Sequence, residues 1–136
     1  MTTITLDDAK KICEGAIAKA GEIGIRIAVT VLDSSGNLLA THRMDGALVL
    51  AVEGSRGKAV ASIMFGQPTG ELEQRASRPT MQALMVQYGG RFILGQGAVP
   101  IHVAGEIVGS CGVGGGTPQE DEDCAVAGME SARITD

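Results

Sequence analysis

Apolar residues recur every three or four positions near the N-terminus, and this spacing predicts an amphipathic helix over residues 6–23. Thr5 and Asp8 stand in the order of a capping box, which satisfies backbone N–H groups at a helix start. Gly21 and Gly24 mark the expected end. The apolar stripe consists of Ala9, Ile12, Cys13, Ala16, Ile17, Ala20 and Ile23.

Segments rich in β-branched residues then predict strands rather than helices. The sequence SSGN and the pair Ala104-Gly105 each separate two such segments, which is typical of hairpin turns. A further apolar segment, RFIL, is expected to form another strand. The five expected strands cover residues 26–33, 38–43, 91–94, 101–104 and 106–113.

Hairpins in place of alternating strands and helices favour an antiparallel sheet, so we expect an α+β fold with helices packed on the sheet faces. The chain of 136 residues has room for one core, and a single domain over residues 1–136 is expected. The remaining expected helices cover residues 48–63, 70–76, 79–87 and 118–132.

Composition and charge narrow the classes of partner. A net charge of −5 and only three aromatic residues argue against nucleic acid, which requires a basic surface and is often bound by stacking. No apolar run approaches the ~20 residues of a membrane span, and the N-terminal sequence lacks a signal-peptide pattern. We therefore expect a cytoplasmic protein with no membrane or nucleic-acid partner.

The stretch GSCGVGGGTPQEDED, residues 109–123, looks at first like a phosphate-binding loop. It matches neither the P-loop nor the dinucleotide-binding pattern of glycines. Thr117 and Glu120 form a second capping box, and the acids after it neutralise the positive helix end that would attract an anion. The glycines are better explained by close backbone approach and positive φ where a strand meets a helix.

Long motifs identify a family resemblance. AVTVLDSSGNLLATHRMDGA (28–47), GKAVAS (57–62) and GAVPIHVAGEIVGSCGVGGGTPQEDEDCAVAG (97–128) resemble the GlcG/HbpS-like family, which includes the C-terminal domain of PduO-type proteins. The resemblance implies a profilin-like α+β fold and assembly as homodimers or larger homo-oligomers. It also implies a small-molecule ligand, because some members bind haem, haem degradation products or iron.

Haem is therefore a possible cofactor, but the donor residues depart from the family pattern. Haem-binding relatives can use a histidine in the first helix, whereas segment 6–23 contains none. His42 and His102 are the only imidazoles of the chain, and neither has a partner at metal-ligand spacing. No built-in metal site is expected.

The segment HRMDG offers candidate functional residues where the second strand ends. Arg43 and Asp45 could converge on a cleft with Met44 and Gly46, and an arginine can bind a carboxylate through two hydrogen bonds. The alternative is an ion pair between Arg43 and Asp45 that only fixes the turn.

Other candidates are scattered along the chain. Lys58 lies among small apolar residues, where it could act on a carbonyl or could extend its ammonium group to the surface. His42 and His102 could each be a ligand, an acid–base group or a packing residue. Gly114 and Gly115 could line a pocket. Cys111 is expected to be a buried thiol, and a nucleophilic role would need a histidine within reach.

Three functions follow. The first is a small-ligand-binding protein, haem- or tetrapyrrole-related, with the ligand held by Arg43, Met44, Asp45, Gly46, His102, Gly114 and Gly115. The second is a cofactor-independent enzyme acting on a carboxylate- or carbonyl-bearing metabolite, in which Arg43 clamps the substrate and Asp45, His42, His102 or Lys58 moves protons. The third is a structural oligomer without a ligand.

Overall fold

A four-stranded antiparallel sheet forms the centre of the protein in the computed structural model, which describes residues 3–132. The strand order is β2-β1-β4-β3, so each hairpin supplies one edge strand and one central strand. The α+β class expected from the hairpin pattern is confirmed. The strands are β1 (Ala28–Asp33), β2 (Leu38–Arg43), β3 (Ala98–Val103) and β4 (Glu106–Gly114).

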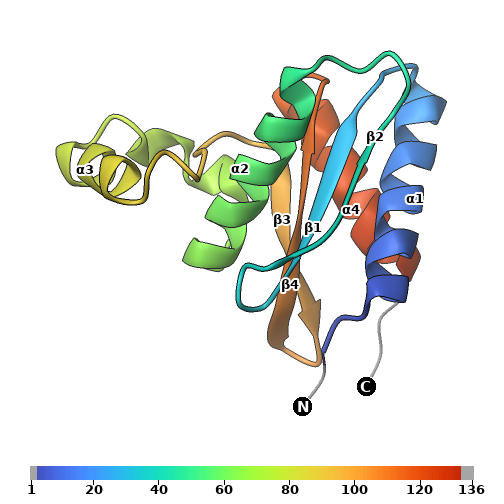
Figure 1. Cartoon of the computed structure of the whole chain (residues 1–136), viewed down its shortest axis with the longest axis horizontal. Coiled ribbons are helices and arrows are strands. Elements are labelled where there is room, and N and C mark those ends of the chain that lie inside the picture. Colours follow the sequence, from blue (N-terminus) through green and yellow to red (C-terminus); the bar gives the residue numbers. More distant parts are fainter. Residues whose placement is uncertain (1–2, 133–136) are drawn as a thin grey trace.

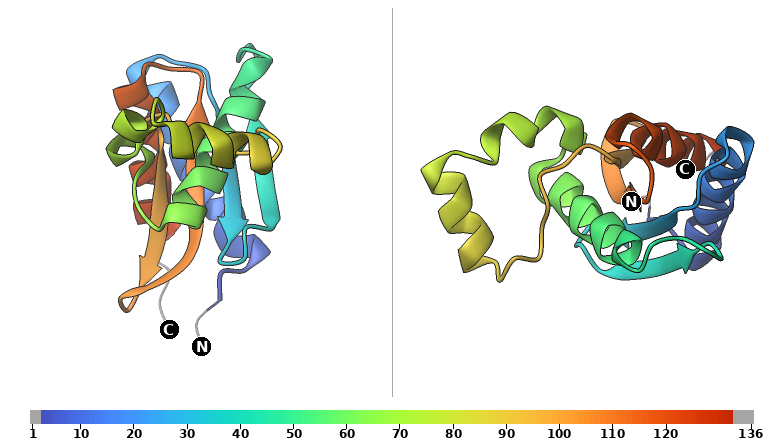
Figure 2. Two further views of the ribbon diagram at one scale, coloured as in Figure 1. Left: turned by 90° about the vertical axis from the view of Figure 1, so that its left-hand side faces the viewer. Right: turned by 90° about the horizontal axis from the view of Figure 1, so that it is seen from above.

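Helices cover both faces of this sheet (Figures 1 and 2). Helices α1 (Leu6–Ile23) and α4 (Pro118–Ala132) pack side by side on one face, and α2 (Leu50–Phe65) lies on the other. Both expected capping boxes form: the Asp8 N–H donates to Thr5 Oγ1 over 3.1 Å, and the Glu120 N–H donates to Thr117 Oγ1 over 3.3 Å. No helix within residues 3–132 has both the length and the apolar character needed to cross a bilayer.

The main core lies between the sheet and the helices α1 and α4. Alternate residues of the central strands point into it, among them Val29, Val31, Cys111 and Val113. The apolar stripe of α1 packs against them and contributes Ala9, Ile12, Cys13, Ala16 and Ala20, as the helical spacing predicts.

A second, smaller cluster anchors an arm that projects from the outer side of α2 (Figure 1). The arm contains the short turns η1 (Thr69–Glu71) and η2 (Glu73–Arg75) and the helix α3 (Pro79–Gln87). The continuous helix expected over 70–76 is therefore wrong, because the chain forms two separate 3-10 turns there. The buried residues of the cluster are Ala61, Leu72, Met81, Phe92 and Leu94.

The expectation of a fifth strand at RFIL, residues 91–94, is also wrong. Phe92 and Leu94 are buried in the arm cluster, while the Ile93 N–H donates to the backbone oxygen of Gly57 on α2 over 3.0 Å. The segment therefore crosses α2 and pairs with no strand. Alternation of buried and exposed residues arises here from packing on a helix, which gives the same local pattern as a sheet edge.

The glycines of β4 allow α2 to lie directly on the sheet. A Cβ atom at Gly112 would overlap the backbone oxygen of Ser55, and one at Gly114 would lie 2.7 Å from that of Ala51. Gly115 has a φ of 122°, a conformation that side-chain-bearing residues rarely adopt. The glycine-rich stretch thus serves close packing and a tight exit from the strand, as expected.

A β-bulge in the first hairpin changes which residues of β2 face α2. Val31 pairs with Ala40, but Leu32 pairs with Leu38, so Leu39 is an extra residue on β2. Simple alternation places Leu38 on the same face as Ala40 and His42. The bulge instead turns Leu38 toward the α2 side, next to Leu32.

Candidate ligand-binding cleft

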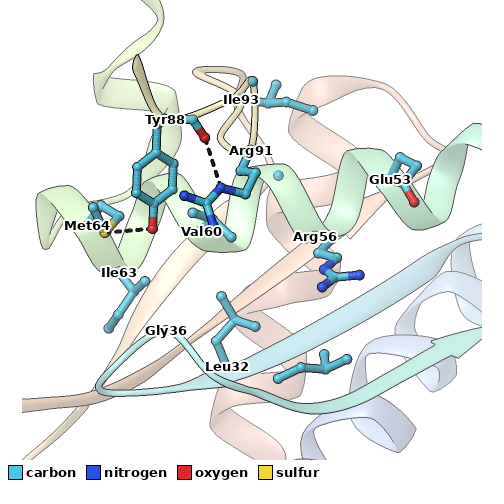
Figure 3. A pocket seen from close by; sticks show the side chains of 14 residues that line it. Leu32, Gly36, Glu53, Arg56, Val60, Ile63, Met64, Tyr88, Arg91 and Ile93 are labelled. Carbon is cyan, nitrogen blue, oxygen red and sulfur yellow. Dashed lines mark hydrogen bonds between the residues drawn. The ribbon is translucent and has the colours of Figure 1, made fainter. Parts of the chain in front are cut away.

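A cleft of about 550 Å³ lies between α2, the β1–β2 hairpin and the segment that follows α3 (Figure 3). Its α2 wall is a stripe of residues spaced three or four apart, which a helix places on one face. The β-bulge described above supplies the opposite wall by turning Leu38 toward this space. The lining residues are Leu32, Gly36, Leu38, Glu53, Arg56, Gly57, Val60, Ile63, Met64, Tyr88, Gly89, Gly90, Arg91 and Ile93.

The walls of the cleft combine aliphatic side chains with charged ones and with the backbone of four glycines. Leu38 is 49% exposed and Ile93 is 40% exposed, so large apolar side chains face solvent here. Exposed apolar side chains that line a concave surface are typical of binding sites for apolar ligands. The cleft therefore favours a ligand with an extended apolar surface.

Two arginines give the cleft its positive charge. Arg91 lies with its guanidinium carbon 4.1 Å from the centre of the Tyr88 ring, and its Nε donates to the Tyr88 backbone oxygen over 2.8 Å. That bond uses one of the five N–H donors of the guanidinium, which leaves the others for a ligand. Arg56 forms no ion pair or side-chain hydrogen bond within residues 3–132. Glu53 adds one negative charge one helical turn before Arg56.

Tyr88 and Met64 close one end of the cleft, and Glu53 and Arg56 lie toward the other (Figure 3). The Tyr88 hydroxyl donates to the Met64 sulfur over 3.8 Å. The Tyr88 ring also packs in a tilted arrangement against Phe92, 5.6 Å between centroids. The stacked Arg91 is thus held by an aromatic group that is itself fixed by the arm.

The segment HRMDG lies elsewhere, at the end of the sheet where β2 ends and β1 begins. Arg43 donates from Nη1 to the Ala47 backbone oxygen over 3.1 Å, and Arg26 donates to the backbone oxygen of Asp45 over 2.8 Å. No ion pair joins Arg43 to Asp45 in the part of the chain that the structure describes. Arg43 therefore fixes the turn through a backbone oxygen and does not need Asp45 to do so.

The structure does bring HRMDG close to the glycines at the end of β4. Ala28 pairs with Arg43 on one side and with Gly114 on the other. Met44 is bonded to the start of β1: its N–H donates to the Ile27 backbone oxygen over 2.9 Å, and its sulfur accepts the Ile27 N–H over 3.3 Å. None of the residues Arg43 to Gly46, Gly114 or Gly115 lines the cleft, and their expected ligand-binding and catalytic roles remain predictions.

The two histidines are far apart. His42 lies on the edge strand β2, opposite Val29, and so on the face that carries α1 and α4. His102 is exposed on the other edge strand, β3, with two strands between them. Neighbouring strands lie about 4.8 Å apart, so the imidazoles are separated by roughly 14 Å or more. They cannot act on one small substrate together with Arg43, which faces away from His42.

Lys58 neither lines the cleft nor reaches the surface. It is 8% exposed, and its Nζ lies 2.9 Å from Oδ2 of Asp121, which is 3% exposed. The second oxygen of Asp121 accepts the Gly116 N–H over 2.8 Å. The lysine is therefore occupied by a buried ion pair that fixes the start of α4.

Cys13, Cys111 and Cys124 are all fully buried and converge on the core between α1, α4 and the sheet. Burial raises the pKa of Cys13 from 9.0 to about 12 and that of Cys124 to about 11. The pKa of Cys111 is raised still further, first by burial and then by the neighbouring thiols. Such thiols are poor nucleophiles. Within residues 3–132, no three His, Cys, Asp or Glu residues are grouped so as to hold a metal ion.

Sequence reasoning missed the charged residues of the cleft, Glu53, Arg56 and Arg91, and its aromatic residue, Tyr88. One signal was available: Glu53 and Arg56 are, with Lys58, the charged residues of a helix that is otherwise mostly apolar. Arg91, on the opposite side of the cleft, follows two glycines with φ near 70° on a segment that was expected to be a strand. Only the packing of the arm brings the two segments together.

A model of the family described as "Haem degrading protein HbpS-like" matches residues 4–130. An uncharacterized 15.0 kDa protein from the dhaT-dhaS intergenic region of Citrobacter freundii is 33% identical over 132 residues, which cover 96% of this chain and 92% of that relative.

Solved structures agree over the whole fold. The Klebsiella pneumoniae protein ORFY superposes with a TM-score of 0.91 at 28% identity, covering 100% of this chain and 94% of the other. A double mutant of Streptomyces reticuli HbpS gives 0.83 at 30% identity, covering 96% and 87%. A complex of PduOC with haem gives 0.86 at 22% identity, covering 96% and 95%, and at that identity supports the fold alone.

Proposed function

Because the chain belongs to the HbpS-like family, we propose that it binds a carboxylate-bearing tetrapyrrole, such as haem, in the cleft between α2 and the first hairpin. The observation that carries this proposal is the presence of aliphatic side chains together with Arg56 and Arg91 in one cleft. A tetrapyrrole is a broad apolar ring system that carries carboxylates on one side. Aliphatic side chains suit the ring, and guanidinium groups suit the carboxylates.

The residues of the cleft fit some parts of haem and not others. They fit the macrocycle and its two propionates. They offer no histidine or cysteine to coordinate the iron, because no residue of either type lines the cleft. Tyr88, Met64 and Glu53 are the lining residues with an atom that could approach a metal. The Tyr88 hydroxyl and the Met64 sulfur bond to each other, and a carboxylate is not among the usual axial ligands of haem.

The alternative function, a cofactor-independent enzyme, finds less support in the geometry. Its candidate residues are divided among three places: Arg43 and Asp45 at one end of the sheet, the histidines on opposite edges, and Lys58 in an ion pair. General acid–base catalysis needs the proton-transferring group within hydrogen-bond reach of the substrate. No one cleft among the described residues gathers this set.

Titration of the purified protein with haem, followed by the Soret absorbance, tests the proposal. Arg56→Gln and Arg91→Gln each remove a charge-assisted hydrogen bond worth about 1.5–3 kcal/mol, so each should weaken haem binding by roughly tenfold or more. Arg78→Gln is the matched control, because Arg78 is exposed and lies outside the cleft. A protein that takes up no haem at stoichiometric concentration would contradict the proposal.

Native mass spectrometry of the freshly purified protein complements this titration. It reports the mass of any ligand carried through purification and the number of chains in one measurement. The homo-oligomer implied by the family resemblance is a further expectation that the same spectrum tests.

A further inference from the structure

We infer that the cleft recognises its ligand through the macrocycle and the carboxylates alone, so that an iron-free dicarboxylic tetrapyrrole binds as tightly as haem. This inference rests on the proposed function and names its ligand class more closely. It follows from the positions of the histidines and cysteines, and from the contacts of the residues that line the cleft.

The positions of the two histidines keep their imidazoles out of the cleft. His42 faces the α1 and α4 side of the sheet, while the cleft lies on the α2 side. His102 is on β3, the edge strand farthest from the β1–β2 hairpin that forms one wall of the cleft. These are the two histidines of the whole sequence, so no other imidazole can enter the cleft.

Burial prevents the three cysteines from coordinating iron in the cleft. All three cysteines of the sequence are fully buried on the α1 and α4 side, and their raised pKa values keep them protonated. A cysteine that ligates haem must be deprotonated, and its sulfur must be open to the iron. To supply one, the core between the sheet and these helices would have to open.

The remaining donors of the cleft are Glu53, Met64 and Tyr88. A carboxylate is not among the usual axial ligands of haem, and the other two side chains have other roles. The Tyr88 ring stacks against the Arg91 guanidinium, and the Tyr88 hydroxyl donates to the Met64 sulfur at the closed end of the cleft. The guanidinium of Arg91 raises the local positive charge for a carboxylate. These contacts give Tyr88 the role of a positioning residue for Arg91.

The test compares haem with iron-free protoporphyrin IX, which has the same macrocycle and the same two propionates. Tyr88 lies in the cleft and is the single tyrosine of a chain without tryptophan, so its fluorescence reports on occupation of the cleft by either compound. We expect dissociation constants for haem and protoporphyrin within about threefold. Arg56→Gln combined with Arg91→Gln should weaken both compounds by at least tenfold, and Arg78→Gln should weaken neither.

A second variant separates the two possible roles of Tyr88. In Tyr88→Phe the ring remains but the hydroxyl is gone, so haem affinity, measured by the Soret titration, should stay within about threefold and the Soret maximum should not move. A shifted maximum together with a tenfold or greater loss of haem alone would identify Tyr88 as an iron ligand and overturn the inference.

The failures of the two proposals are distinguishable. If haem binds and depends on the two arginines while protoporphyrin does not bind, the proposed function stands and iron independence is wrong. If neither compound binds, the proposed function itself fails. If both bind with no loss in the double arginine variant, the ligand lies outside this cleft and both assignments to it are wrong.

Discussion

Lys58 on α2 and Asp121 on α4 form an ion pair of 2.9 Å that links the helices on the two opposite faces of the sheet. Both side chains are almost fully inaccessible, and the Lys58 Nζ also lies 3.4 Å from the Gln96 backbone oxygen. Gly97 makes room for the pair, since a Cβ there would lie 2.6 Å from Nζ. Three chain segments therefore meet at one charged contact.

Removing one partner of this pair should destabilise the fold strongly. Lys58→Met and Asp121→Asn each leave a charge buried without its partner, and the expected loss in the free energy of unfolding is about 3–5 kcal/mol. The double variant should lose less than the sum of the two single losses. Urea unfolding followed by circular dichroism measures these differences. The exposed pair Lys11–Asp7 is the control, because Lys11→Met should cost less than about 1 kcal/mol.

Gly112 should not tolerate a side chain. In Gly112→Ala the new methyl group would meet the backbone of α2 at Ser55 and Ala59, which cannot move without lifting the helix from the sheet. We expect a loss of about 3 kcal/mol or more, or a failure to fold. Gly54→Ala on α2 is the matched change: its Cβ would meet no atom within 4 Å, and it should stabilise by about 0.5–1 kcal/mol. Thermal unfolding compares the two, and equal effects would contradict this account of packing.

The three thiols should be unreactive in the native protein. Their raised pKa values and complete burial predict little reaction with dithionitrobenzoate at pH 8, and reaction of all three thiols in denaturant. The same shift has a consequence for stability. The native state holds these protons more tightly than the unfolded state. The contribution of the thiols to the free energy of unfolding should therefore be fully present below about pH 8 and be lost as the pH rises above about 9. Rapid labelling of one thiol at pH 8 would identify an accessible, functional cysteine.

Alanine at Arg43 and Asp45 separates the two possible positions of the ligand. If the cleft is the site, Arg43→Ala and Asp45→Ala should change haem affinity by less than about twofold, whereas Arg56→Gln should weaken it by roughly tenfold. The physical reason is that Arg43 is bonded to a backbone oxygen of its own turn and lines no part of the cleft. If a Soret titration shows a tenfold loss of haem affinity in Arg43→Ala or Asp45→Ala and none in Arg56→Gln, the ligand binds at HRMDG instead.

Part of the candidate site could be read from local pattern. The helix expected over residues 48–63 is enough to place Glu53, Arg56 and Val60 on one face, although the sequence analysis did not single them out. The segment from Tyr88 to Ile93 could not be assigned in the same way, because its alternating burial comes from packing on α2. Lys58 shows the same limit: its apolar neighbours indicated burial, but its partner is 63 residues further along the chain.

The sequence by itself determined the helix starts, the hairpins and the family. Thr5 with Asp8, Thr117 with Glu120, and Ala104 with Gly105 act through atoms a few residues apart, so a short stretch contains the whole interaction. Tertiary structure alone decided the sheet edge, the buried ion pair and the cleft. A one-residue bulge at Leu39 turns Leu38 toward α2, and the packing of the arm carries Arg91 to the same place. Such contacts depend on the summed packing of distant segments, which no local pattern records.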